Sequence, residues 1–243
     1  MTQAWLPYCG PAPTPDGILG RWNTDPVLLL ALGVGLAALV ALRRSPRDRT
    51  WAALGILALA VSFVSPLCAA SSALFTARTI HHLWLMAVAA PLFAWCLPKL
   101  NPGHLATATL VQALVLWAWH APPLYAQALS NDGVYWLMQL SLLGSAIGFW
   151  AAVRRAGAPA ATGALLVTLV QTGLLGAILT FAPQALYLPH AGSTGPWGLS
   201  WLEDQQLAGL VMWAPGAGLY LAAALGLLLR ALSDQHAPAG RPA

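Results

Sequence analysis

The chain has 243 residues, of which only 7% are charged and 58% are hydrophobic. An ordinary soluble domain carries about 25% charged residues, so a water-soluble fold of this size could not cover its surface. The composition therefore indicates a protein embedded in a lipid bilayer. The net charge of +4 gives no reason to expect nucleic-acid binding.

Seven uncharged intervals, each long enough to hold a membrane span, separate the charged positions. About 20 apolar residues in a helix cross roughly 30 Å of hydrocarbon, and a helix satisfies its own backbone groups where lipid cannot. We predict an all-α fold, a polytopic membrane helical bundle of about seven transmembrane helices. In chain order the predicted spans are 26–42, 51–67, 80–97, 105–120, 133–153, 162–181 and 205–230.

The sequence shows one membrane domain and no internal repeat. Residues 1–25 have no basic start and no continuous apolar core, so we expect an outer N-terminal segment and not a cleaved signal peptide. Residues 26–232 form the single transmembrane domain. The polar residues 233–243 are predicted to be a short disordered cytoplasmic tail.

The basic residues predict the orientation. Seven spans place nine of the eleven Lys and Arg residues on one side and only Arg21 and Arg78 on the other. Positive loops stay in the cytoplasm, so the N-terminus is expected outside and the C-terminus inside. A different number of spans would scatter these charges over both sides.

This orientation gathers polar side chains at the outer membrane boundary. Ionisable groups close to hydrocarbon are costly and usually functional, although a His can also be solvated at the interface and an acid can simply cap a helix. The residues expected at this outer boundary are His81, His82, His120, Asp204, Gln205 and Gln206.

Two methionines extend this polar group into the membrane. Met86 lies four residues after His82, so both project from one helix face, and Met212 lies two turns beyond Asp204. Imidazole and thioether together suit copper(I), whereas imidazole alone also suits copper(II), zinc or haem iron. Packing in an apolar helix is the alternative explanation for each methionine.

Cys9 and Cys68 share the outer side. Because that compartment is oxidising in bacteria, they could form a disulfide, but a metal pair and two free thiols stay open as alternatives. The chain has no GxSxG, HExxH, CxxC or phosphate-binding glycine loop, and we expect no enzymatic activity.

Four blocks of sequence carry a family resemblance over roughly residues 60–230. They read GLSWLEDQQLAGLVMW at 198–213, WAWHAP at 117–122, LTFA at 179–182 and HLWLM at 82–86, the last continuing to APL at 90–92. These blocks resemble the CtaG family of cytochrome c oxidase assembly factors, and the Asp-Gln-Gln-Leu-Ala-Gly motif that begins at Asp204 is the most specific of them.

The resemblance implies a multi-pass protein of the bacterial plasma (inner) membrane that matures haem–copper oxidases. Its implied partners are the oxidase catalytic subunit and a copper donor protein, and its implied cargo is copper. The residues carried over by position are His82, His120 and Asp204, with Gln205, Gln206 and Met212 nearby. The chain departs from relatives at Arg78 and Gln139, where they often carry His, and at His81, where they commonly carry Gln.

Two other functions fit the same residues. His82 and His120 on adjacent helices could be the axial ligands of a haem in a membrane cytochrome. Pro215 inside the last helix and the glycines of the last two helices are also compatible with a transporter or channel for a metal ion.

Overall fold

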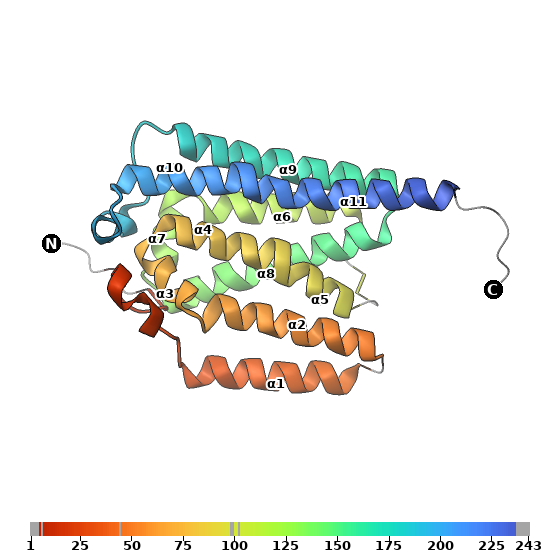
Figure 1. The fold of residues 1–243 in the computed structure, drawn as a ribbon, viewed down its shortest axis with the longest axis horizontal. Coiled ribbons are helices and arrows are strands. Elements are labelled where there is room, and N and C mark those ends of the chain that lie inside the picture. Colours follow the sequence, from red (N-terminus) through yellow and green to blue (C-terminus); the bar gives the residue numbers. More distant parts are fainter. Residues whose placement is uncertain (1–4, 6, 44, 98–99, 102, 237–243) are drawn as a thin grey trace.

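The computed structural model describes residues 5, 7–43, 45–97, 100–101 and 103–236. All regular elements within these residues are helical, and no strand occurs among them. Figure 1 shows the long helices lying roughly parallel or antiparallel in one bundle. The predicted all-α class is therefore confirmed.

Eleven α-helices and five short 3₁₀ or π segments make up the described chain. The 3₁₀ segments are η1 (Pro15–Gly20), η3 (Leu188–His190) and η4 (Gly195–Trp197), and the π segments are η2 (Leu85–Ala89) and η5 (Met212–Gly216). The α-helices are α1 (Pro26–Leu42), α2 (Pro46–Phe63), α3 (Pro66–Ala73), α4 (Phe75–Trp84), α5 (Ala90–Cys96), α6 (Leu105–Trp119), α7 (Pro122–Ala128), α8 (Asp132–Arg155), α9 (Ala158–Phe181), α10 (Trp201–Val211) and α11 (Ala217–His236).

Four helical stretches are long and apolar enough to cross a membrane: Phe75–Cys96, Asp132–Arg155, Ala158–Phe181 and Trp201–Asp234. The helices α2 and α3 form a fifth if their pair, bent by 42°, counts as one span, and α1 and α6 are shorter apolar helices. Many Leu and Val side chains on these helices face outward, as expected for contact with lipid. The chain is thus a helical membrane protein, while the number of seven spans and the orientation stay predictions.

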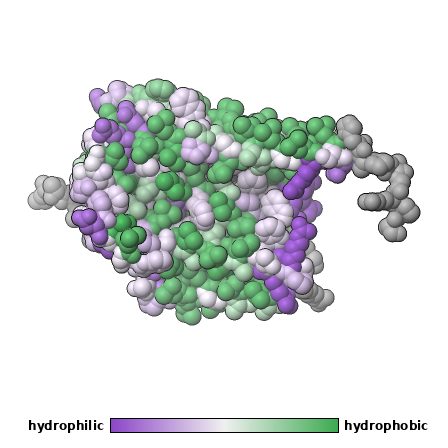
Figure 2. Space-filling model, in the orientation of Figure 1, coloured by the Kyte–Doolittle hydropathy of each residue, from purple (hydrophilic) through white to green (hydrophobic). Residues whose placement is uncertain are grey.

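The loops gather at two opposite ends of the bundle (Figure 1). One end holds η1, α3, α7 and the 182–200 loop. At the other, the Arg43 guanidinium donates to the Cys96 carbonyl and the Arg154 guanidinium to the Leu97 carbonyl. Figure 2 shows hydrophilic side chains at both ends of the visible face and mostly hydrophobic ones between them. The structure therefore has the banded surface of a membrane-embedded bundle.

Side-chain caps explain where several helices begin. The Asp25 carboxylate accepts from the Val27 amide and starts α1, and Asn131 caps α8 in the same way. Ser200 and Glu203 form a reciprocal capping box that starts α10. Glu203 is therefore occupied as a cap of its own helix.

The third predicted helix begins earlier than its hydropathy indicates. Phe75, and not Ile80, is its first residue, because the Asp204 carboxylate accepts from the backbone amides of Phe75 (2.6 Å) and Thr76 (3.1 Å). His81 and His82 consequently lie about two turns inside the helix and are buried. Their predicted position at its outer end is wrong for this reason.

The last helix is longer than predicted at both ends. It starts at Trp201 and continues through a π segment to His236, so residues 233–236 of the predicted tail are helical. The remainder of that tail, 237–243, lies outside the described residues, as do three basic residues used to predict the orientation, Arg44, Lys99 and Arg241.

Candidate metal centre

Two π turns distort the bundle, and each contains a methionine that the sequence singled out. Met86 lies in η2, where the Ala90 amide donates to the Leu85 carbonyl five residues back. In a π turn the Met86 carbonyl would accept from the amide of residue 91, but residue 91 is a proline and has no amide hydrogen. The Trp150 indole N–H donates to that carbonyl instead, at 2.8 Å. This bond from α8 stabilises the π turn and positions Met86.

Met212 begins the second π turn, η5. Pro215 cannot donate to the Val211 carbonyl four residues back, and the Ala217 amide donates to the Met212 carbonyl, five residues back. Such π turns occur frequently at functional sites. Each methionine is thus presented by a backbone irregularity that a proline requires.

A close helix crossing brings Met212 to the bundle interior. A Cβ on Gly176 of α9 would lie 2.7 Å from the Gly209 carbonyl oxygen, and a Cβ on Gly209 would lie 2.5 Å from the Gly176 carbonyl oxygen. Only glycine on both helices permits this approach, which is the small-residue packing typical of membrane helices. The same Gly176 position would meet the Met212 Cβ at 3.0 Å, so the crossing fixes the depth of Met212.

A small buried cavity of about 10 Å³ lies between these elements. Its lining combines two imidazoles, two thioethers, two hydroxyl-bearing threonines and the Tyr220 ring. The lining residues are Thr79, His82, Leu83, Met86, Leu116, His120, Thr172, Met212 and Tyr220. A volume near 10–15 Å³ holds about one water molecule, so the cavity suits one small ligand or one ion.

The rings of the two cavity histidines lie close together, edge to face. Their ring centroids lie 5.7 Å apart with planes inclined at 81°. Two imidazoles that bind one metal at about 2.0–2.1 Å per nitrogen place their ring centres about 6 Å apart. The observed separation of His82 and His120 therefore matches a pair of rings that share one ion.

Hydrogen bonding leaves ligand nitrogens available on both rings. The His120 Nδ1 lies 2.8 Å from the Leu116 carbonyl, and since a carbonyl only accepts, Nδ1 carries the proton and Nε2 a free lone pair. Neither nitrogen of His82, nor Nε2 of His120, has a hydrogen-bond partner in the described part of the chain. Proteins orient an imidazole ligand through a hydrogen bond from its other ring nitrogen, and the bond from the His120 Nδ1 to the Leu116 carbonyl is of this kind.

The donor set fits a soft monovalent metal ion. His82, His120, Met86 and Met212 are neutral donors, and thioethers select copper(I) over harder ions. No group of three or more His, Cys, Asp or Glu residues suited to a metal occurs among the described residues. A metal ion held by the two imidazoles would therefore take its remaining protein ligands from Met86 and Met212.

Four other predicted site residues lie away from this cavity. His81 is buried against Phe63, with ring centroids 5.1 Å apart. The Asp204 carboxylate serves the start of α4. The Gln205 side chain holds the 182–186 loop through the Leu186 amide, and Gln206 receives at its backbone carbonyl a bond from Thr180. Metal binding by these four stays a prediction that the geometry does not support.

Some lining residues escaped the sequence analysis. Thr172 and Tyr220 carry no metal-ligand signature. Tyr220 is held by long-range contacts, a bond from the Gln112 amide at 3.3 Å and stacking on the Trp150 ring. The prolines at positions 91 and 215 were the available signal, because each requires a backbone irregularity beside a methionine.

Arg78 lies one turn before His82 on α4 and is fully buried. Its guanidinium carbon lies 5.3 Å from the centre of the Tyr135 ring, a cation–π contact. Its three side-chain nitrogens have no hydrogen-bond partner among the described residues. Two carboxylates at this end of the bundle, Asp204 and Glu203, bind backbone amides at helix starts instead.

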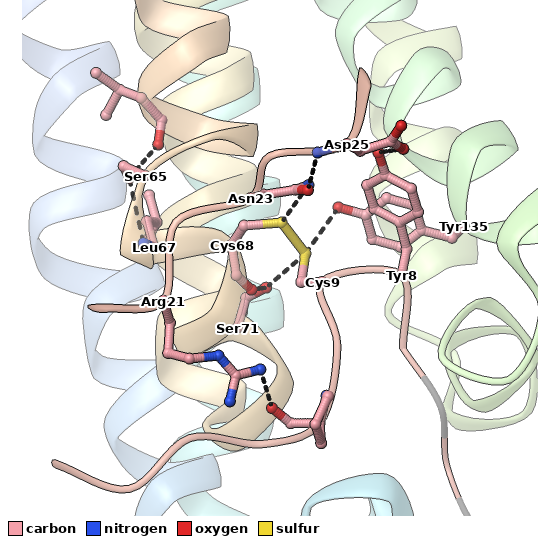
Figure 3. The surroundings of a disulfide bond; sticks show 12 residues. Tyr8, Cys9, Arg21, Asn23, Asp25, Ser65, Leu67, Cys68, Ser71 and Tyr135 are labelled. Atoms are coloured by element: carbon pink, nitrogen blue, oxygen red, sulfur yellow. Dashed lines mark hydrogen bonds between the residues drawn. A yellow bond between two sulfur atoms is a disulfide. The ribbon is translucent and has the colours of Figure 1, made fainter. Parts of the chain in front are cut away.

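A disulfide joins the N-terminal segment to α3, at the end of the bundle that also holds η1 and α7. Cys9 and Cys68 are joined in the structure, which decides among the three alternatives for this pair. Figure 3 shows the Cys9 sulfur beside the Tyr135 hydroxyl, at 3.5 Å. The disulfide therefore fastens the N-terminal segment over the ring that contacts Arg78.

The N-terminal segment has a second fastening. The Tyr8 hydroxyl donates to the Asp25 carboxylate at 2.5 Å (Figure 3), and this bond holds the pKa of that carboxyl below its usual value. The Tyr8 ring stacks on Tyr135, with centroids 5.1 Å apart. The segment is thus an ordered cover over the bundle end.

An aromatic cluster covers the end of α6 next to His120. The Tyr187 hydroxyl donates to the His120 carbonyl at 2.7 Å, and the Tyr187 ring stacks on Phe75. His190 donates from Nδ1 to the Ala73 carbonyl at 3.2 Å and accepts at Nε2 from the Tyr125 hydroxyl at 2.7 Å. His190 is therefore part of this structural network and is not available as a ligand.

Fold and cavity together define a helical membrane protein with a small buried cavity lined by imidazoles and thioethers. A comparison with protein families matches residues 33–101 and 102–234 to the cytochrome c oxidase caa3 assembly factor family (Caa3_CtaG). The match spans most of the chain, and the chain belongs to this family of oxidase assembly factors. Neither the curated proteins nor the solved structures contain a match.

Proposed function

We propose that this protein supplies copper to the catalytic subunit of a haem–copper oxidase in the bacterial plasma membrane, acting as an assembly factor and not as an enzyme. The observation that carries the proposal is the cavity of about 10 Å³ between His82, His120, Met86 and Met212. Copper is the cargo of this cavity, received from a donor protein and released to the oxidase.

The proposed topology has seven spans, with the disulfide end outside. Arg43 follows the end of α1, and Arg154 and Arg155 are the last residues of α8. All three lie at the end of the bundle opposite the disulfide (Figure 1), which agrees with a cytoplasmic position for positive residues. A disulfide is formed and kept in an oxidising compartment, which supports an outer position for Cys9 and Cys68. The cavity then lies in the outer half of the membrane.

The cavity size argues against the haem alternative. A haem between His82 and His120 needs space for a whole macrocycle, whereas the space between the rings holds about one water molecule. The transporter alternative is tested by loading proteoliposomes: uptake of copper by the purified protein alone would favour it.

The decisive experiment compares three variants in cells and after purification. His82→Ala and His120→Ala should lower both oxidase maturation and copper(I) content, while His81→Ala keeps both, because the His81 ring lies outside the cavity. All three should reach the membrane in equal amounts. Normal copper content and normal maturation in both cavity variants would refute the proposed site.

A further inference from the structure

The site next to His82 contains a fixed positive charge, on Arg78, for which the described residues provide no ion-pair partner. Arg78 and His82 are separated by four residues on α4, so their side chains leave the same face of the helix. Arginine stays protonated in proteins. Any ion bound at His82 therefore lies close to a permanent guanidinium charge.

No carboxylate forms an ion pair with Arg78 among the described residues. Three acidic side chains near this end bind other groups: Asp204 binds the amides of α4, Asp25 the Tyr8 hydroxyl, and Glu203 the Ser200 amide. The Arg78 nitrogens have no acceptor in the part of the chain that the structure describes. The contact with the Tyr135 ring leaves the net charge of the site unchanged.

The cavity donors are all neutral as well. Two imidazoles and two thioethers bring no negative charge to a bound ion, in contrast to sites built from thiolates or carboxylates. The electrostatic free energy between the ion and Arg78 is proportional to the charge of the ion. The unfavourable electrostatic free energy with Arg78 is therefore twice as large for a divalent ion as for a monovalent ion at the same position.

We infer that Arg78 determines the specificity of the cavity, so that it accepts a soft monovalent cation and rejects zinc(II) and copper(II). This inference rests on the proposed function, since it concerns the same cavity. It deepens that function by stating which charge of metal is carried and which residue imposes the choice.

Neutralising Arg78 should raise the affinity for a divalent ion more than the affinity for a monovalent ion. If neutralising Arg78 raises the affinity for a monovalent ion by a given factor, the affinity for a divalent ion rises by about the square of that factor. For a charge about one helical turn away we expect roughly tenfold for the monovalent and roughly a hundredfold for the divalent ion. Arg78→Lys keeps the charge and should keep the wild-type preference.

The test uses the full-length protein in detergent, with silver(I) as a stable soft monovalent probe and zinc(II) as the divalent probe. Dissociation constants are measured by isothermal titration for the wild type, Arg78→Gln and Arg78→Lys, with His120→Ala to show that binding occurs in the cavity. We expect wild-type silver(I) binding that excess zinc(II) does not displace, and a gain of zinc(II) binding in Arg78→Gln only.

The outcomes separate the two proposals. If the wild type binds no silver(I), the proposed function fails. If silver(I) binds but zinc(II) binds the wild type equally well, the specificity role of Arg78 is refuted, and this comparison needs no variant to fold. Equal changes for both ions in Arg78→Gln, or an equal gain of zinc(II) binding in Arg78→Lys, would refute it too.

Discussion

The imidazole rings of His82 on α4 and His120 at the end of α6 lie edge to face, with centroids 5.7 Å apart. Both nitrogens of His82 and Nε2 of His120 have no hydrogen-bond partner in the described chain. A buried polar atom without a protein partner is uncommon in native proteins, and an ordered water or a bound ion is a usual explanation. Since the methionines on the adjoining walls are soft donors, the copper(I) ion of the proposed function would supply the missing partner of both rings.

The thioethers can be tested without disturbing the histidines. Met86→Leu and Met212→Leu keep volume and apolarity, so each should cost less than about 1.5 kcal/mol of stability. Each should weaken silver(I) binding by about tenfold or more, because a soft donor is lost. Met138→Leu is the matched control, since Met138 is equally buried but does not line the cavity. Unchanged binding in both cavity variants would show that thioethers are not ligands.

The sequence could predict the pairing of His82 with Met86, because a separation of four residues on one helix is a local property. It could not predict that His120 and Met212 close the same cavity, since their approach depends on the crossing of four helices. The early start of α4 depends on Asp204, 129 residues further along the chain. Hydropathy contains no information on such a bond, and the predicted boundary was wrong there.

The partners of Arg78 also could not be predicted from the sequence. Its position before His82 was apparent in the sequence, and a partner carboxylate was the natural expectation for a charge in a membrane. The nearby acids are instead used at helix starts, where backbone amides are their partners. Which acceptor an acid meets is decided by packing, and the sequence alone does not give it.

The glycine crossing between α9 and α10 should be intolerant of any side chain. Gly209→Ala places a methyl group 2.5 Å from the Gly176 carbonyl oxygen, and such overpacking typically costs about 1–3 kcal/mol. Gly163→Ala on α9 is the control, because its Cβ would meet no atom within 4 Å. Thermal unfolding in detergent should show a lower Tm for Gly209→Ala only, together with weaker silver(I) binding as Met212 shifts.

The disulfide should contribute strongly to stability through the chain that it closes. Cys9 and Cys68 are 59 residues apart, and closing a loop of that length stabilises the folded state by about 4 kcal/mol in the chain-entropy treatment. The double variant Cys9→Ser/Cys68→Ser should unfold at a clearly lower denaturant concentration than the wild type.

The control for that experiment is Cys96→Ala, which removes a free buried cysteine and should change the midpoint little. Treatment of the wild type with a dithiol reductant should reproduce the double variant, and the reductant should have no effect on the double variant itself. Equal midpoints of the oxidised wild type and the double variant would contradict a stabilising disulfide.

His190 should make the stability of the protein depend on acidity. Burial, together with the nearby Arg78 charge, lowers the pKa of His190 to about 3, whereas an unfolded His titrates near 6.5. Between these values the unfolded state binds more protons than the folded state, so stability falls as the pH falls below about 6.5. Above that pH the contribution is complete and constant.

The measurement compares unfolding free energies of the wild type and His190→Gln in detergent from pH 8 to pH 4. The wild type should lose stability on acidification faster than the variant by at most about 1.4 kcal/mol per pH unit, because glutamine does not titrate. Parallel curves would mean that His190 is already protonated in the fold. In that case the Tyr125 hydroxyl would have to accept a hydrogen bond from Nε2, contrary to the donation inferred from the Ala73 contact.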